Sequence, residues 1–189
     1  GGVSLGANVA LETAVLAPDR VAGLLLEMPV LNHALEAAIV AFVPLMFAAR
    51  FAPVTVNTVR RLTKPLPRGV LPFWAGIGLD TLNQQAAPMA AVLHGLIFGR
   101  QAPPSAQRQA IAAPALVVGH PSDPIHPFAD AEMLAEEMPH ATFVRARSIV
   151  EWRVTPDRLN AIAADFAHEC WDRRETRVAT GRSRTGSTR

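Results

Sequence analysis

The chain has 189 residues, of which 50% are hydrophobic and 18% charged, with a formal net charge of +2. This composition excludes a largely disordered chain, and the length is typical of one globular domain. Cys170 is the single cysteine, which excludes an internal disulfide, and no Cys or His spacing resembles a zinc site. We therefore expect a cytoplasmic protein without metal or other cofactor.

The chain opens with a Gly-x-Ser-x-Gly pentapeptide, Gly2-Val3-Ser4-Leu5-Gly6, and the run Asn8–Leu16 that follows predicts a helix. A strand that turns sharply into a helix holds its corner residue in a strained backbone conformation, and small flanking residues allow close approach. We predict Ser4 as a nucleophile, with the Leu5 N–H as an oxyanion donor at the helix N-terminus. A glycine-rich turn with an incidental serine has the same pattern.

Three short apolar runs then predict strands, at residues 21–29, 115–120 and 142–146. A helix is predicted between the second and third, from Phe128 to Met138. Strand and helix alternate, which indicates a parallel α/β sheet. In this helix we expect the acidic residues on the solvent side and Ala129, Met133 and Leu134 on the inner side. The acidic residues are Asp130, Glu132, Glu136 and Glu137.

Residues 31–109 are rich in Ala, Leu, Phe and Pro and predict a cap of several short helices. Its longest apolar stretch, Ala37–Ala49, contains Pro44 and is too short to span a bilayer, so no transmembrane segment is expected. The cap aromatics form either a pocket lining or a local core. They are Phe42, Phe47, Phe51, Phe73, Trp74 and Phe98.

A last helix is predicted from Pro156 to Trp171, with an apolar stripe of Leu159, Ile162, Ala163, Phe166 and Cys170 that should pack on the sheet. Residues 173–189 carry six arginines against Glu175 and predict a disordered basic tail. A solvated end is favoured over a nucleic-acid or membrane contact. The expected domains are residues 1–30 with 110–172, the cap 31–109 and the tail 173–189.

Taken in order, these pieces resemble the C-terminal two-thirds of an α/β-hydrolase, over roughly residues 1–171. The match consists of the opening pentapeptide, the helix ending at Ala17-Pro18-Asp19-Arg20-Val21, the strand from Gly23 to Pro29, a cap insertion, and the segment Pro114–Pro127. The resemblance implies a partial parallel sheet with a helical cap. It also implies that Ser4 is the nucleophile and that Asp123, after the penultimate strand, is the acid that orients a base. Asp123 before a proline is also common turn chemistry.

The family places its histidine in the loop after the last strand, and here that loop, 146–153, contains none. Three explanations stay open. His126 swings toward Ser4 as the base; Glu151, with a pKa raised by burial, accepts the proton; or the site is weak or inactive. His120 ends a strand and is expected to be structural, as are His33, His94, His140 and His168.

The leading hypothesis is a serine hydrolase that cleaves an ester or related acyl bond of a small apolar substrate through an acyl-enzyme on Ser4. The alternative is a non-catalytic protein of the same fold that binds a ligand or partner, because the expected histidine is absent. No nucleic-acid partner is expected, and the oligomeric state stays open.

The first residue is Gly1 and the predicted nucleophile is already the fourth residue. We therefore expect a fragment that lacks its N-terminal strands and the second oxyanion donor that the family takes from upstream. The strand from Gly23 to Met28 would then have an open apolar edge. Such a chain is expected to be inactive by itself and to aggregate.

Overall fold

The computed structural model of the protein describes residues 1–66 and 73–185. The chain divides into two compact units, which we call the core unit (Gly1–Ala34 with Gln101–Arg189) and the helical unit (Leu35–Arg100). The sequence analysis placed these boundaries after residues 30 and 109. The second boundary lies earlier because α6 (Ser105–Gln109) is tied to the core unit by the ion pair between Arg108 and Glu137.

A parallel four-stranded sheet in the order β1-β2-β3-β4 forms the centre of the core unit. Its strands are β1 (Gly2–Val3), β2 (Leu24–Glu27), β3 (Ala115–Gly119) and β4 (Ala141–Arg145). Leu24 pairs with Ala115, which in turn pairs with Ala141. Every residue of β3 is buried, as expected for a central parallel strand. The predicted parallel α/β architecture is confirmed.

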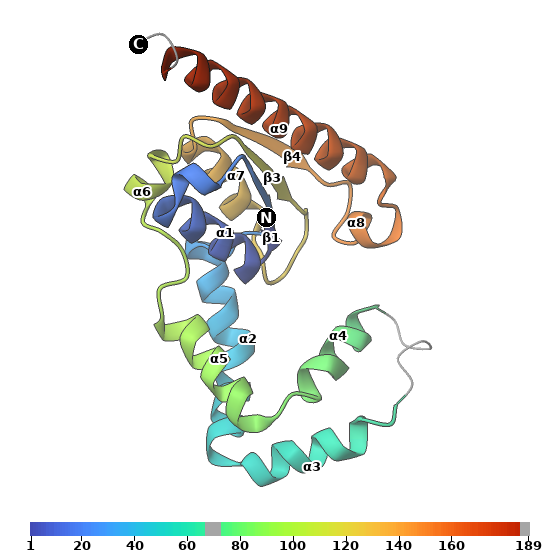
Figure 1. Ribbon diagram of the computed structural model, residues 1–189. Coiled ribbons are helices and arrows are strands. Elements are labelled where there is room, and N and C mark those ends of the chain that lie inside the picture. The colour runs from blue at the N-terminus through green and yellow to red at the C-terminus, as the bar shows by residue number, and fades with distance from the viewer. Residues whose placement is uncertain (67–72, 186–189) are drawn as a thin grey trace. The chain divides into compact units, whose positions relative to one another are not determined.

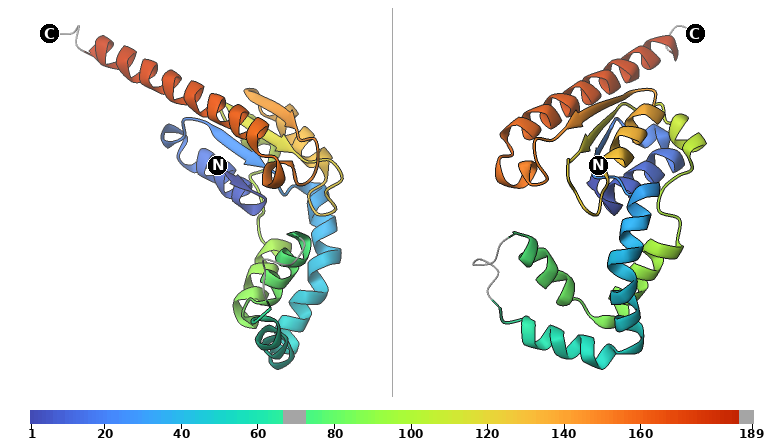
Figure 2. Two further views of the ribbon diagram at one scale, coloured as in Figure 1. Left: turned by 90° about the vertical axis from the view of Figure 1, so that its right-hand side faces the viewer. Right: turned by 180° about the vertical axis from the view of Figure 1, so that it is seen from behind.

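Helices cover both faces of this sheet (Figures 1 and 2). α1 (Leu5–Leu16) and α7 (Phe128–Glu137) pack on one face, where Leu11 and Leu134 meet Leu26 and Val117. η1 (Pro18–Arg20) follows α1. α8 (Glu151–Val154) and α9 (Asp157–Thr185) lie on the other face. Successive strand residues point to opposite faces, so the two apolar cores alternate along β3.

The prediction of which α7 residues face inward is partly wrong. Leu134 is fully buried as expected, but Asp130 is also fully buried and Ala129 is exposed. Asp130 is inside because its carboxylate accepts the backbone N–H groups of Leu31, His33 and Ala34, near the start of α2. These hydrogen bonds offset the desolvation of the charge, which the periodicity of the sequence does not show.

The position of the sheet edge also differs from the expectation. β2 has neighbours on both sides, because Gly2 pairs with Leu26 and Val3 pairs with Glu27. Among the described strands, β1 is the one at this edge, next to β2. The open edge was predicted for the strand from Gly23 to Met28, but among the described strands it belongs to β1, which pairs with β2 along its other side.

α9 confirms the predicted stripe, since Leu159, Ile162 and Phe166 pack against the sheet. It continues past Trp171 as far as Thr185, so the expectation of disorder from residue 173 is wrong over this range. Residues such as Arg and Ala favour helix, and Glu169 pairs with Arg173 one turn later. The rest of the predicted tail, residues 186–189, lies outside the described residues.

The helical unit contains most of α2 (Asn32–Phe51), together with α3 (Pro53–Thr63), α4 (Phe73–Leu82) and α5 (Ala86–Phe98). Its small core contains Met46, Ala49, Val56, Ala86, Met89 and Leu93, with Phe42 packed against it. Phe47, Phe51 and Phe98 are exposed. The side chains of Phe73 and Trp74, which were expected among the cap aromatics, lie outside the described part.

α2 is longer than its sequence suggested, because the helix continues through Pro44 and has 20 residues. An 18-residue window of it has a mean hydropathy of 1.8 and is 22% buried. By length and composition this helix is able to cross a membrane, although core helices of globular proteins pass the same test. The helix is therefore longer than the apolar stretch Ala37–Ala49 from which the sequence expectation was drawn, and the absence of a transmembrane segment stays a prediction.

Candidate active site

Ser4 occupies the sharp turn between β1 and α1, with φ 56° and ψ −125°. Its backbone N–H donates to the carbonyl of Glu27 at 2.9 Å, so the residue stands at the carboxyl edge of the sheet. A Cβ on Gly2 would overlap the carbonyl group of Gly6. Gly2 is therefore needed for the close approach of strand and helix, as the pentapeptide pattern predicts.

Ser4, His126 and Asp123 form a continuous chain of contacts. Ser4 Oγ lies 2.8 Å from His126 Nε2, and His126 Nδ1 lies 3.0 Å from Asp123 Oδ2. Because an ionised carboxylate only accepts hydrogen bonds, Nδ1 carries the ring proton and Nε2 is left to accept the Ser4 hydroxyl proton. The histidine is thereby oriented by the acid and directed at the serine oxygen.

The Asp123 carboxylate is held by its own loop. Oδ1 accepts the backbone N–H groups of Ile125 at 2.8 Å and His126 at 2.9 Å. Burial raises the pKa of Asp123, but the hydrogen bonds from His126 and Ile125 outweigh it and lower the pKa below its ordinary value. Asp123 therefore stays ionised at neutral pH, as a group that stabilises a protonated histidine must.

Left-handed backbone conformations gather at this edge of the sheet. Among the described non-glycine residues, those with positive φ are Ser4 (56°), Met28 (51°) and Ser122 (61°). They follow the carboxyl ends of β1, β2 and β3 in turn. Such conformations cost about 1–3 kcal/mol each and cluster at functional sites. The strain therefore marks the same place as the Ser4–His126–Asp123 chain.

Of the two bases left open by the sequence, the structure brings only His126 to Ser4. The prediction of Glu151 as a possible base is wrong. Arg158 Nε lies 2.7 Å from its carboxylate, and the backbone N–H of Arg147 also donates to it. These contacts, first of all the one with Arg158, lower the pKa of Glu151 to about 2 although burial opposes them. A carboxylate with such a pKa is a poor proton acceptor at neutral pH.

The signal for His126 lies in the local sequence Asp123-Pro124-Ile125-His126. An aspartate that accepts the N–H groups two and three residues later forms an Asx-type turn. This turn brings the side chain of the third residue back to the carboxylate. The loop after β4, where the family resemblance placed the histidine, instead supplies Ser148 and Arg153 to a different cluster.

That cluster is Glu27, His120 and Arg153, which we call the buried charge cluster because Glu27 and His120 are buried, whereas Arg153 reaches Glu27 from the exposed side. Glu27 Oε1 lies 2.9 Å from His120 Nε2 and 3.0 Å from Arg153 Nη1, and His120 Nδ1 donates to the carbonyl of Ser148. Burial lowers the pKa of His120, but the Glu27 and Ser148 contacts raise it overall. Burial raises the pKa of Glu27, but His120 and Arg153 lower it overall.

The buried charge cluster is connected to the nucleophile turn, because the backbone carbonyl of Glu27 accepts a hydrogen bond from the Ser4 N–H. It ties the ends of β2 and β3 to the loop after β4, so the expected structural role of His120 agrees with its contacts. Sequence reasoning did not single out Glu27. A charged residue that ends an otherwise apolar strand was the available signal.

Leu5 is the first residue of α1, where backbone N–H groups have no partner within the helix. Its N–H lies beside Ser4 at a helix N-terminus, which favours negative charge. Its role as an oxyanion donor stays a prediction. No group of three or more potential metal ligands occurs within residues 1–66 and 73–185.

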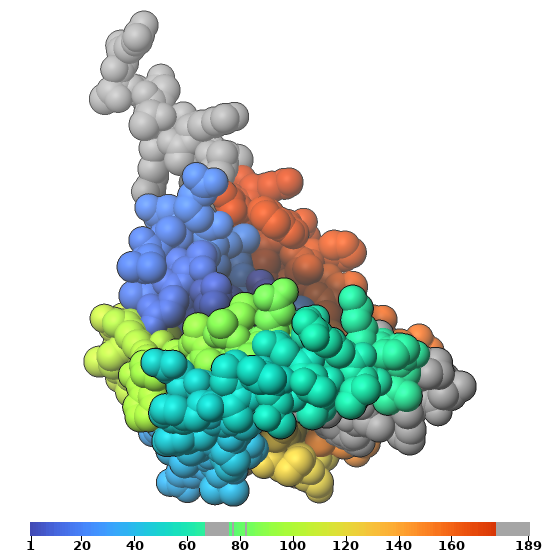
Figure 3. Space-filling model, turned by 90° about the horizontal axis from the view of Figure 1, so that it is seen from below, coloured from blue at the N-terminus to red at the C-terminus, as the bar shows by residue number. Residues whose placement is uncertain are grey.

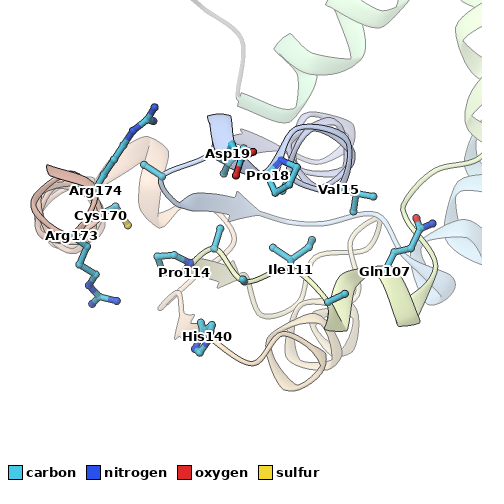
Figure 4. Close-up of a pocket in the computed structure, with 16 residues that line it drawn as sticks. Val15, Pro18, Asp19, Gln107, Ile111, Pro114, His140, Cys170, Arg173 and Arg174 are labelled. Atoms are coloured by element: carbon cyan, nitrogen blue, oxygen red, sulfur yellow. The ribbon is translucent and has the colours of Figure 1, made fainter. Parts of the chain in front are cut away.

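A cavity of about 630 Å³ lies at the opposite edge of the sheet (Figure 4). Pro114, Val21 and Ala22, which precede β3 and β2, line it together with Cys170 and Arg173 of α9. None of Ser4, Asp123 and His126 lines this cavity. It is therefore separate from the candidate active site, which lies at the carboxyl ends of the strands.

Comparison with solved structures identifies the architecture. BpoC from Mycobacterium tuberculosis H37Rv has a TM-score of 0.60 at 22% identity, over 89% of this chain and 66% of its own. MenH from S. aureus has a TM-score of 0.60 at 21% identity, over 90% and 67%. The enol-lactonase from Burkholderia xenovorans LB400 has a TM-score of 0.61 at 18% identity, over 88% and 64%.

The chain has the α/β-hydrolase fold. It spans about two thirds of the length of these solved structures. No protein-family model and no curated protein matches the sequence. At this level of identity the comparison establishes the α/β-hydrolase fold alone, and the chemistry has to be argued from the residues at the site.

Proposed function

We propose that this chain carries the reaction centre of a serine hydrolase that cleaves an ester or related acyl bond of a small apolar substrate. The observation that supports this most directly is the 2.8 Å contact between Ser4 Oγ and His126 Nε2, together with the 3.0 Å contact between His126 Nδ1 and Asp123. Nucleophile, base and orienting acid are the parts that acyl transfer through a serine requires.

In the proposed reaction Ser4 Oγ attacks the acyl carbon while its proton passes to His126 Nε2. The charge on the imidazolium is balanced by Asp123, whose lowered pKa keeps it ionised. The proton then passes from His126 to the leaving alkoxide, which leaves an acyl group on Ser4. Water attacks this acyl group with His126 again as the base, and Ser4 is regenerated.

The Leu5 N–H is the proposed first donor to the oxyanion that forms during both attacks, since it begins α1 beside the serine. The apolar composition of the helical unit motivates the choice of a small apolar substrate. One structural neighbour is an enol-lactonase, which is consistent with an ester-type bond as substrate. The alternative of a non-catalytic binding protein depended on a missing base, and His126 supplies a candidate for it.

A fluorophosphonate probe tests the proposal, because it forms a covalent adduct with activated serines. In the natural protein, we expect labelling of Ser4, identified by peptide mass spectrometry, and hydrolysis of short acyl esters. Ser4→Ala should abolish both. Ser122→Ala is the matched control, since this exposed serine lies in the His126 loop but outside the contact chain. Labelling and turnover that survive Ser4→Ala would refute the proposal.

A further inference from the structure

Charge in the helical unit is strongly one-sided. Between Glu36 and Asp80 the chain has no acidic residue, yet it contains five cationic ones. These are Arg50, Arg60, Arg61, Lys64 and Arg68. Such a segment is attracted to a negatively charged surface, at about 1 kcal/mol per Lys or Arg close to an anionic membrane.

The same segment exposes much of its apolar surface. Of the sixteen large hydrophobic residues that are exposed among the described side chains, ten lie in the helical unit, and eight of these lie between Glu36 and Asp80. Phe51 is 73% exposed and Leu62 is 72% exposed. A cluster of exposed apolar side chains of this kind marks an interaction surface.

α3 and its C-cap residue Lys64 place most of their apolar and cationic side chains on different faces, although Val54, seven residues before Arg61, lies on the cationic side. Val59 and Leu62 are three residues apart and share one face, whereas Arg61 and Lys64 share the other. Val56 on the inner side anchors the helix to the small core. An amphipathic helix with aliphatic residues on one face and cations on the other is typical of helices that lie in a membrane interface.

A groove next to α3 continues this surface. It has a volume of about 660 Å³ and lies between the C-terminal part of α2 and α5, with Phe47, Phe51 and Phe98 in its lining. The Phe47 and Phe51 rings stack at 5.5 Å, and the Arg50 guanidinium lies 5.8 Å from the Phe51 ring. Figure 3 shows the face formed by α3 and the adjoining end of α2.

From these observations we infer that the helical unit binds the surface of an anionic lipid bilayer through α3 and the C-terminal part of α2. Leu62, Phe47 and Phe51 enter the acyl boundary, and Arg50, Arg61 and Lys64 contact lipid phosphates. A nucleic acid would use the cations but not the exposed aliphatic side chains. This inference does not depend on the proposed hydrolase function.

The test measures co-sedimentation of the full-length protein with vesicles of phosphatidylcholine alone or with 30% phosphatidylglycerol, an arbitrary working composition of roughly membrane-like surface charge. We expect binding to the anionic vesicles that weakens as salt is raised. Phe51→Ser with Leu62→Ser, and separately Arg61→Gln with Lys64→Gln, should each reduce binding by about ten-fold or more. Leu16→Ser is the matched control, because Leu16 is 81% exposed in the core unit.

Circular dichroism verifies that each variant keeps its fold, so a loss of binding reports on the surface. Equal binding to neutral vesicles, or binding unaffected by both double variants, would overturn the inference. So would the absence of binding by the folded protein. Resistance of bound protein to high salt and alkaline carbonate would also overturn it, since that result indicates that α2 spans the bilayer. Self-association that Phe51→Ser abolishes, without vesicle binding, would assign the face to a second copy of the chain.

Discussion

The core unit and the helical unit differ in which side chains they bury: the core unit buries polar and charged groups, and the helical unit exposes many apolar ones. Every described polar or charged residue that is buried lies in the core unit: Asn8, Glu27, Arg108, His120, Asp130 and Glu151. In the helical unit the described charges lie outside the core, and most of the large exposed hydrophobic residues occur there. A fold that positions reacting groups needs buried, partnered charges, whereas a surface that meets an apolar phase needs the reverse.

The largest expected effect comes from replacing His126, the histidine at the carboxyl edge of the sheet in the core unit. His126→Gln should lower ester turnover by about three orders of magnitude or more, because Ser4 loses its base. Steady-state kinetics of the full-length protein measure this effect. His33→Gln is the control, since His33 also contacts an aspartate through Nδ1 but its side chain is 56% exposed. Equal losses in both variants would contradict the assigned role.

The next largest effect concerns the buried charge cluster. Glu27→Ala leaves His120 buried beside Arg153 without a carboxylate, and should reduce the free energy of unfolding by about 3–5 kcal/mol. Urea unfolding followed by circular dichroism measures this quantity. The exposed residue Glu132 on α7 offers the comparison Glu132→Ala, with an expected change within about 0.5 kcal/mol. A loss below 1 kcal/mol at Glu27 would contradict a tightly coupled cluster.

Leucine truncation compares the two units directly. Leu134→Ala removes a fully buried side chain between α7 and the sheet and should cost about 2–5 kcal/mol of unfolding free energy. Leu62→Ala in α3 should change it by about 0.5 kcal/mol or less, because that side chain is largely exposed. Similar losses at both positions would show that Leu62 is covered in the folded protein.

The last prediction is a pH dependence of stability at Glu151. Its contact with Arg158, opposed by burial, lowers its pKa from 4.5 to about 2. Because the folded pKa lies below the unfolded one, the resulting stability is fully present above pH 4.5 and is lost as the pH falls toward 2. Glu151→Gln should therefore unfold at lower urea concentration at pH 7, with a difference from the natural protein that narrows below pH 4.5. A constant difference across this range would exclude the ion pair as its source.

Several features could be predicted from the sequence because they depend on local chemistry. The Gly-x-Ser-x-Gly turn at Ser4 follows from backbone sterics, since a Cβ at Gly2 would meet Gly6. The apolar run of β3 predicts a buried parallel strand, and alternation of strands with helices predicts the layered architecture. The limits of α2 and α9 were less accurate. α2 continues through Pro44, which is a strong helix-breaking signal in the sequence, and α9 continues into a basic segment whose composition predicts disorder.

Long-range partners were decided by the tertiary structure. Asp130 has the spacing of a solvent-facing residue, yet it is buried because backbone N–H groups from residues 31–34 converge on it. Glu151 had the appearance of a possible base until Arg158 and Arg147 were placed beside it. His126 comes within reach of Ser4 because its turn after β3 extends across the end of β2 toward the end of β1. A sequence specifies which groups can donate, accept or carry charge, but only the folded chain brings residues more than a hundred positions apart within hydrogen-bond distance.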